Sequence, residues 1–268
     1  MLKLVFPKTA SDTLARGESA SGQGFPPDRA ATGEELAAWL AGRVTMTYLR
    51  QRLGIETDRE AWVFGQGLKP LHIENWYSVH SVIRNSLRLA LLLGRARRNA
   101  RSIQLTHNEV GIAGLPRPFD GLRILHVSDP HVDVDDAFPH VLAERVRDLD
   151  YDLCILTGDY RYKTFGPCEP ALAGLQRVRA QLKGPVYAVL GNHDSIRMVP
   201  AMEAMGIRVL LNEAVSLRRG DALLHLVGVD DPHYYRTDNI EAACRGIDHR
   251  APAILAVHSP EVYRHAAH

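Results

Sequence analysis

Residues 122–131, LRILHVSDPH, begin as a short apolar run and end in two side chains that bind metal ions well. The residues up to Val127 are typical of a buried strand. Asp129 and His131 follow at its carboxyl end, which is the edge where open α/β sheets bind their ligands. A carboxylate and an imidazole two residues apart can reach one cation if the chain turns between them, and Pro130 favours a turn.

Three later segments repeat this order of an apolar run followed by potential metal ligands. The runs LCILT (153–157), VYAVL (186–190) and AILAV (253–257) lead into Gly158-Asp159, Gly191-Asn192-His193-Asp194 and His258. Each polar residue alone is explained by an ordinary turn, but independent turns have no reason to produce the ordered set. The pattern predicts an α/β fold whose sheet gathers ligands from distant segments at one edge.

Length and composition limit the class of protein. A chain of 268 residues can hold one substantial domain with an extension, and its net charge of +1 gives no argument for a nucleic-acid partner. Three cysteines without regular spacing indicate a reducing compartment, not a disulfide framework. We see no secretory signal and no apolar run near the ~20 residues of a membrane span, so we expect a cytoplasmic protein.

We predict three parts along the chain. Residues 1–33, rich in Ser, Gly, Ala and Pro, predict a flexible leader. Residues 34–115 predict a helical extension, with amphipathic helices over 34–55 and 76–101 and an edge strand over 103–110. Residues 116–268 form the domain with the recurring strands; closely spaced strands at 207–211, 215–218 and 223–229 suggest an antiparallel portion.

The helix expected over residues 76–101 leaves two interpretations open. It has an apolar face, it carries or precedes six arginines, and no acidic residue lies between Glu74 and Glu109. Such a basic amphipathic helix is typical of peripheral contact with a membrane surface. Alternatively, its leucines pack on the protein and its arginines lie in water.

The ligand-type residues predict a metal centre. The set of oxygen and nitrogen ligands consists of Asp129, His131, Asp159, Asn192 and His258. Such a set suits borderline divalent ions such as Mn²⁺, Fe²⁺ or Zn²⁺. Asp159 lies between the two groups of ligands in the chain, so its carboxylate is the candidate to bridge two ions.

These motifs, in this order, resemble the calcineurin-like metallophosphoesterase superfamily from Leu122 onwards. The resemblance implies a four-layer α/β/β/α sandwich and hydrolysis of a phosphodiester or pyrophosphate by a hydroxide that bridges two divalent metal ions. Carried over to this sequence, Asp129 and His131 would bind the first metal, Asp159 would bridge, and Asn192 and His258 would bind the second. His193 would be catalytic, acting on the leaving oxygen and not as a ligand, and Asp194 would orient its ring.

Two departures from the family pattern stand out. Tyr162 occupies the position where the family often has a second Asp, and the family's Gly-His-x-His turn does not follow His258, so we expect a C-terminally truncated domain. The sequence most resembles prokaryotic phosphodiesterases, including UDP-2,3-diacylglucosamine hydrolases, which implies a membrane-associated or nucleotide-linked phosphoester substrate. The loop 160–170, with Arg161, Tyr162, Lys163 and Phe165, would stack a base and hold a phosphate if the substrate is a nucleotide; otherwise it is only a loop at the rim of the site. The alternative is a degenerate, non-catalytic module that binds phosphate, metal or a membrane.

Overall fold

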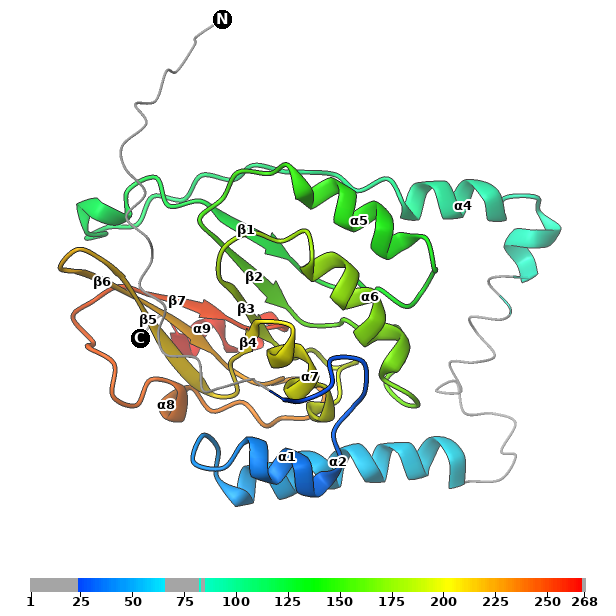
Figure 1. Ribbon diagram of the computed structural model, residues 1–268, viewed down its shortest axis with the longest axis horizontal. Helices are drawn as coiled ribbons and strands as arrows, with labels where there is room; N and C mark the ends of the chain where they lie inside the picture. Colours follow the sequence, from blue (N-terminus) through cyan, green and yellow to red (C-terminus); the bar gives the residue numbers. More distant parts are fainter. Residues whose placement is uncertain (1–23, 66–81, 83–84, 267–268) are drawn as a thin grey trace, which may run out of the picture.

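A parallel sheet of four strands lies at the centre of the computed structural model, which describes residues 24–65, 82 and 85–266. The strands are β1 (Ile124–Val127), β2 (Leu153–Thr157), β3 (Val186–Val189) and β4 (Ile207–Val209), in the order β1-β2-β3-β4. All three pairings are parallel, with crossovers through α5 (Phe138–Arg147), α6 (Glu169–Arg179) and the η2 (Ile196–Met198) and α7 (Val199–Ala204) pair (Figure 1). Parallel strands therefore end at one edge of the sheet.

The helices cover one face of this sheet, and a second sheet covers the other. Leu142 of α5 and Leu175 of α6 pack on Leu125, Leu156 and other residues of the helix-facing side. The second sheet consists of β5 (Glu213–Arg219), β6 (Ala222–Gly228) and β7 (Ala253–Ala256), with β5 antiparallel and β7 parallel to β6. The apolar core between the two sheets includes Leu153, Ile155, Val189, Leu217, Leu224 and Leu226.

The short helix α8 (Ile240–Ala243) completes the layers. Ala243 is buried against Val227 and Val229, on the side of the second sheet that faces away from the first. The fold is thus the expected α/β/β/α arrangement. The prediction of an antiparallel portion was wrong for residues 207–211, because β4 pairs parallel with β3. The other two predicted strands, β5 and β6, form an antiparallel hairpin.

Two N-terminal helices pack on the helical layer of the domain (Figure 1). They are α1 (Gly33–Trp39) and α2 (Met46–Gly65), and Leu36, Leu40 and Leu49 belong to the same buried core as the parallel sheet. The single helix predicted over 34–55 was wrong, because α1 ends at Trp39 and a turn with Gly42 at a φ of 77° separates it from α2. The Thr45 hydroxyl then accepts a hydrogen bond from the backbone N–H of Tyr48 at the start of α2.

The segment after α2 differs from the prediction in two places. The helix predicted over 76–101 lies partly outside the described residues, and its described part is broken before α4 (Leu93–Ala100), where Leu91 has a φ of 57°. Residues 103–110 form no strand, because no neighbouring strand pairs with them in the described structure. The chain then enters β1 through η1 (Arg117–Phe119), and η3 (Pro260–Val262) and α9 (Tyr263–Ala266) follow β7.

Only residues 24–33 of the predicted leader are described. In this stretch Ala31 is buried, and its N–H donates to the carbonyl of Arg197 at 2.9 Å. The ring of Phe25 packs edge-on against Trp39, with centroids 5.8 Å apart. The division into leader, extension and domain at residues 33 and 115 stays a prediction.

The close approach of the two sheets at Gly228 gives a test of the fold. A Cβ at this position would overlap the Leu210 side chain and lie 3.0 Å from Cγ1 of Val189. We expect Gly228→Ala to lower the free energy of unfolding by about 1–3 kcal/mol through overpacking. Chemical denaturation measures this change.

Gly54→Ala is the matched control, because Gly54 is exposed on α2 and nothing lies within 4 Å of a Cβ there. This control should stabilise the protein by about 0.5–1 kcal/mol through helix propensity. Equal effects of both substitutions would contradict the close packing at Gly228.

Candidate metal centre

The ends of β1, β2, β3 and β7 meet at one place, but β7 belongs to the second sheet, so the prediction that a single sheet edge gathers all the ligands was wrong for His258. The turn after β1 lies against the turn after β2, because the N–H of Asp129 donates to Gly158 O (3.1 Å) and the N–H of His131 donates to Asp159 O (3.0 Å). The N–H of His193, after β3, donates to Oδ1 of Asp159 at 3.0 Å. Asp159 therefore lies between the other ligand-bearing turns.

The turns have strained backbone conformations. Asp129, His131 and Asp159 have φ values of 50°, 38° and 58°, which non-glycine residues adopt only where the surrounding structure holds them. A Cβ on Gly158 would overlap the backbone nitrogen of Gly191, and one on Gly191 would overlap the Asp159 carboxylate. The turns after β2 and β3 lie so close together that neither position has room for a side chain, so both must be glycine.

Three histidine rings face the Asp159 carboxylate. Its Oδ2 lies 3.8 Å from Nε2 of His131 and 3.7 Å from Nε2 of His193, and its Oδ1 lies 3.5 Å from Nε2 of His258. Two groups of potential ligands share this carboxylate: His131, Asp159 and His193, and Asp129, Asp159 and His258, each with ligand atoms within 4.8 Å of one another. The arrangement can hold two cations on one bridging carboxylate.

Backbone carbonyls orient the three rings. The Nδ1 atoms of His131, His193 and His258 lie 2.6, 2.8 and 2.8 Å from the carbonyl oxygens of Arg161, Tyr162 and Thr157. Because a carbonyl only accepts, each Nδ1 carries a proton and each ring turns its Nε2 towards the centre. This is the usual support for a metal-binding histidine, so the residues present fit divalent metal ions.

Asn192 reaches the same place from the β3 turn. Its Oδ1 lies 2.9 Å from Nε2 of His258, so two groups that would both bind a metal face each other. Without a bound metal ion, the pKa of His258 lies above its ordinary value. Burial alone would lower this pKa, but the Asp159 charge and the hydrogen bond to the Thr157 carbonyl outweigh it. The Asn192 oxygen is an acceptor, and so is Nε2 when it carries no proton. A proton on Nε2, or a cation bound between the two atoms, would remove this repulsion.

Asp194 has a different role from the predicted one. Its carboxylate accepts N–H hydrogen bonds from Asp159 (2.7 Å), Gly191 (2.8 Å), Tyr160 (2.9 Å) and Arg161 (3.3 Å). The His193 ring is oriented by the Tyr162 carbonyl instead. The prediction that Asp194 orients His193 was therefore wrong, because its oxygens hold the β2 and β3 turns together.

Electrostatics at the centre follow from burial and from neighbouring charge. Burial and the Asp159 charge raise the pKa of Asp194 to about 6, although its backbone hydrogen bonds act in the opposite direction. Burial also lowers the pKa of His193, which favours the neutral ring. At neutral pH Asp194 is mostly ionised, so two nearby carboxylates leave a negative charge that suits cations.

The loop 160–170 does not present all its predicted groups to a substrate. Arg161 is only 2% exposed and its guanidinium donates to the Gly166 carbonyl at 2.8 Å, which contradicts a role in phosphate binding. Tyr162, at the departure from the family pattern, lies edge-on to His131 with centroids 6.1 Å apart. Its N–H donates to Oδ1 of Asp133 at 2.6 Å. Sequence reasoning missed the contributions of Tyr162, Thr157 and Arg161, because backbone carbonyls leave no residue-type signal.

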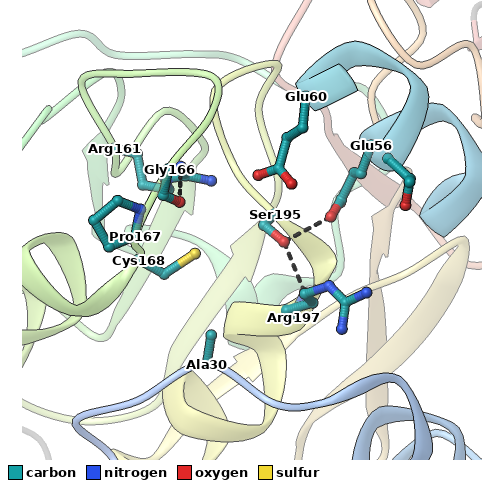
Figure 2. A pocket seen from close by; sticks show the side chains of 10 residues that line it. Ala30, Glu56, Glu60, Arg161, Gly166, Pro167, Cys168, Ser195 and Arg197 are labelled. Atoms are coloured by element: carbon teal, nitrogen blue, oxygen red, sulfur yellow. Dashed lines mark hydrogen bonds between the residues drawn. The ribbon is translucent and has the colours of Figure 1, made fainter. Parts of the chain in front are cut away.

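A separate hollow of about 160 Å³ lies beside these turns. Figure 2 shows it between α2 and the turns; its lining includes Glu56, Glu60, Arg161, Cys168, Ser195 and Arg197. Burial raises the pKa of the Cys168 thiol to about 11, so the thiol stays protonated at neutral pH and is a poor nucleophile. None of the candidate metal ligands lines this hollow.

Comparisons with known proteins agree with this geometry. Residues 122–249 match the family described as calcineurin-like phosphoesterase. The Bacillus subtilis (strain 168) protein named uncharacterized metallophosphoesterase YkoQ is 30% identical over 182 residues, which cover 63% of this chain and 65% of that protein. A Danio rerio protein named transmembrane protein with metallophosphoesterase domain is 24% identical over 174 residues, covering 59% of this chain and 39% of that protein.

The matched segments span less than two thirds of either curated relative. A crystal structure of a protein of unknown function from Aquifex aeolicus is matched at 16% identity with a TM-score of 0.28, covering 51% of this chain and 90% of that chain. The family match, the Bacillus relative and the assembled strand-end ligands lead to one conclusion: residues 122–249 of this chain are similar to the calcineurin-like phosphoesterase family.

Proposed function

We propose that this protein is a divalent-metal-dependent phosphoesterase that hydrolyses a phosphodiester or pyrophosphate bond. The observation that carries the proposal is the Asp159 carboxylate, which faces the Nε2 atoms of three histidines from three different turns. When bound, two ions of Mn²⁺, Fe²⁺ or Zn²⁺ would lower the pKa of water and neutralise charge on the phosphate oxygens. The similarity of residues 122–249 to the calcineurin-like phosphoesterase family supports the same reaction class.

The residues of the chain have separate roles in this proposal. Asp129 and His131 would hold one metal ion and Asn192 and His258 the other, with Asp159 shared between them. In the structure Asp129 lies in the same group as His258, and His131 in the same group as His193, so metal binding would have to bring Asp129 and His131 together.

His193 contacts the leaving oxygen; its Nε2 faces the centre, and its Nδ1 proton is held by the Tyr162 carbonyl. With its proton on Nδ1, the neutral ring can only accept at Nε2, so His193 would have to take up a second proton at Nε2, from solvent or from the attacking water, before it protonates the leaving group.

Metal removal tests the reaction. The purified chain should hydrolyse bis(p-nitrophenyl) phosphate with Mn²⁺, lose this activity in EDTA and regain it when Mn²⁺ is restored, because the ions supply the nucleophile and the charge stabilisation. Asp159→Asn should abolish the recovery, since an amide offers one oxygen where the carboxylate offers two. Tight Mn²⁺ binding without hydrolysis would instead support the non-catalytic module.

His193→Ala separates catalysis from metal binding. We expect kcat to fall about 10²–10⁴-fold, the usual contribution of a proton-transfer group, while bound Mn²⁺ measured by elemental analysis is unchanged. His140→Ala is the control, because His140 is exposed on α5. Loss of Mn²⁺ from His193→Ala would place His193 in the ligand shell, which its position beside His131 and Asp159 also allows.

We further propose that the segment 82–101 contacts an anionic membrane surface. Val82, Leu89 and Leu91 are 62%, 86% and 90% exposed, and α4 has no buried residue. Arginines at 95, 97 and 98 lie on this helix, and apolar groups flanked by arginines suit an interface with acidic headgroups. Within the residues that the structure describes, no helix has the length and apolar character needed to span a bilayer.

Vesicle binding tests the membrane contact. The chain should co-sediment with phosphatidylcholine vesicles that contain phosphatidylglycerol, and less so in high salt, because salt screens the attraction. The double substitution Leu89→Glu and Leu91→Glu should reduce binding at least about tenfold, since each leucine contributes on the order of 1.5–3 kcal/mol when buried. Val110→Glu, at a 75% exposed apolar residue outside the segment, should change nothing. Absence of wild-type binding would refute the contact.

A further inference from the structure

The side chain of Arg52 on α2 is completely buried. Its guanidinium donates to Asp230 (Nε, 3.1 Å), to Glu56 (Nη1, 2.7 Å) and to the backbone carbonyl of Asp194 (Nη2, 2.9 Å). It also lies over the ring of Tyr235, 3.1 Å from the centroid. A buried cation is tolerated only where its partners are held in place, so these contacts fix α2 against the domain.

Glu56, one turn further along α2, binds the same stretch of the domain. Its Oε2 accepts a hydrogen bond from the hydroxyl of Ser195 at 2.7 Å, and its Oε1 accepts one from the N–H of Ile196 at 2.8 Å (Figure 2 shows the Ser195 contact). One turn of α2 therefore binds residues 194–196, which follow His193 directly in the chain.

These contacts connect α2 to the ligands of the candidate metal centre. Arg52 holds the backbone carbonyl of Asp194, while the Asp194 carboxylate holds the N–H of Asp159 at 2.7 Å. Asn192 and His193 are the two residues immediately before Asp194. A shift of Asp194 would therefore move both the central carboxylate and the groups that come from β3.

The other end of the network is fixed to the second sheet. Oδ2 of Asp230, two residues after β6, accepts hydrogen bonds from the hydroxyls of Tyr48 (2.7 Å) and Thr237 (2.7 Å) as well as from Arg52. Tyr48 is also on α2. The helix thus links the end of β6 to the turn after β3.

We propose that Arg52 and Glu56 are positioning residues of the metal centre, which set the place of Asn192 and His193 relative to Asp159. Neither side chain needs to touch metal or substrate. The inference rests on the function proposed above and goes beyond it, because it assigns part of the centre's support to a helix that lies outside the family-matched residues 122–249.

Arg43 offers a matched control in the same N-terminal extension. Its side chain is 13% exposed and binds Glu203 at 2.8 Å, Glu213 at 2.5 Å and the Val209 carbonyl at 2.9 Å. These partners lie on α7, at the end of β4 and on β5, away from residues 191–196. Removal of Arg43 disrupts a comparable ion-pair network without touching the turn after β3.

The experiment compares Arg52→Met, Arg52→Lys and Glu56→Gln with Arg43→Met in the full chain. Isothermal titration calorimetry measures Mn²⁺ affinity, at a temperature well below the lowest unfolding midpoint of the set. Thermal unfolding of the metal-free proteins measures stability. We expect Arg52→Met and Glu56→Gln to weaken Mn²⁺ binding about 10–100-fold, as loss of outer support for metal ligands does. Arg52→Lys should restore part of the affinity, whereas Arg43→Met should lower the unfolding midpoint and leave Mn²⁺ affinity unchanged.

The outcomes separate positioning from general stability. Wild-type Mn²⁺ affinity in Arg52→Met and Glu56→Gln, with unfolding midpoints lowered as in Arg43→Met, would overturn the inference. If Arg52→Met does not fold, Arg52→Lys and Glu56→Gln decide in the same way: weaker binding supports positioning, and unchanged binding overturns it. A wild-type chain that binds no Mn²⁺ would refute the proposed function itself and this inference with it.

Discussion

The buried carboxylate of Asp194 is the constraint on which the candidate centre depends. It accepts the N–H groups of Asp159, Tyr160, Arg161 and Gly191, so one side chain holds the turns after β2 and β3 together. These hydrogen bonds keep Asp159 in a left-handed conformation that a non-glycine residue adopts only at a cost. A buried acceptor with four donors is strong enough to hold such a backbone.

Backbone groups also orient the three histidines. Each ring is set by the carbonyl oxygen of a residue at a strand end or in the loop that follows, and each therefore directs Nε2 towards Asp159. The groups that hold the histidine rings are thus backbone carbonyls, and the positions of these carbonyls depend on the register of the parallel sheet. Because β2 and β3 are buried strands, that register is rigid.

The N-terminal extension is part of the same structure. Leu36, Leu40 and Leu49 share the core of the parallel sheet, and the Arg52 and Glu56 side chains bind residues 194–196. The fold around the candidate centre is therefore supported from outside residues 122–249. Burial of the Arg52 charge costs desolvation energy, which the contacts with Asp230, Glu56 and the Asp194 carbonyl offset. Because Asp194 directly follows Asn192 and His193, these contacts reach the turn that carries both residues.

The sequence alone determined the strands β1, β2 and β3 and the residues after them, because apolar runs and turn residues are local signals. It also identified Asp129, His131, Asp159, Asn192, His193 and His258 as one set, which the structure brings together. It misplaced what depends on distant partners: the hydrogen bonds of Asp194, the break at Leu91, the absent strand at 103–110 and the pairing of β4. Only the tertiary structure decided these, since a hydrogen bond or a strand pairing is defined by which distant backbone groups arrive beside it, and no local pattern contains that information.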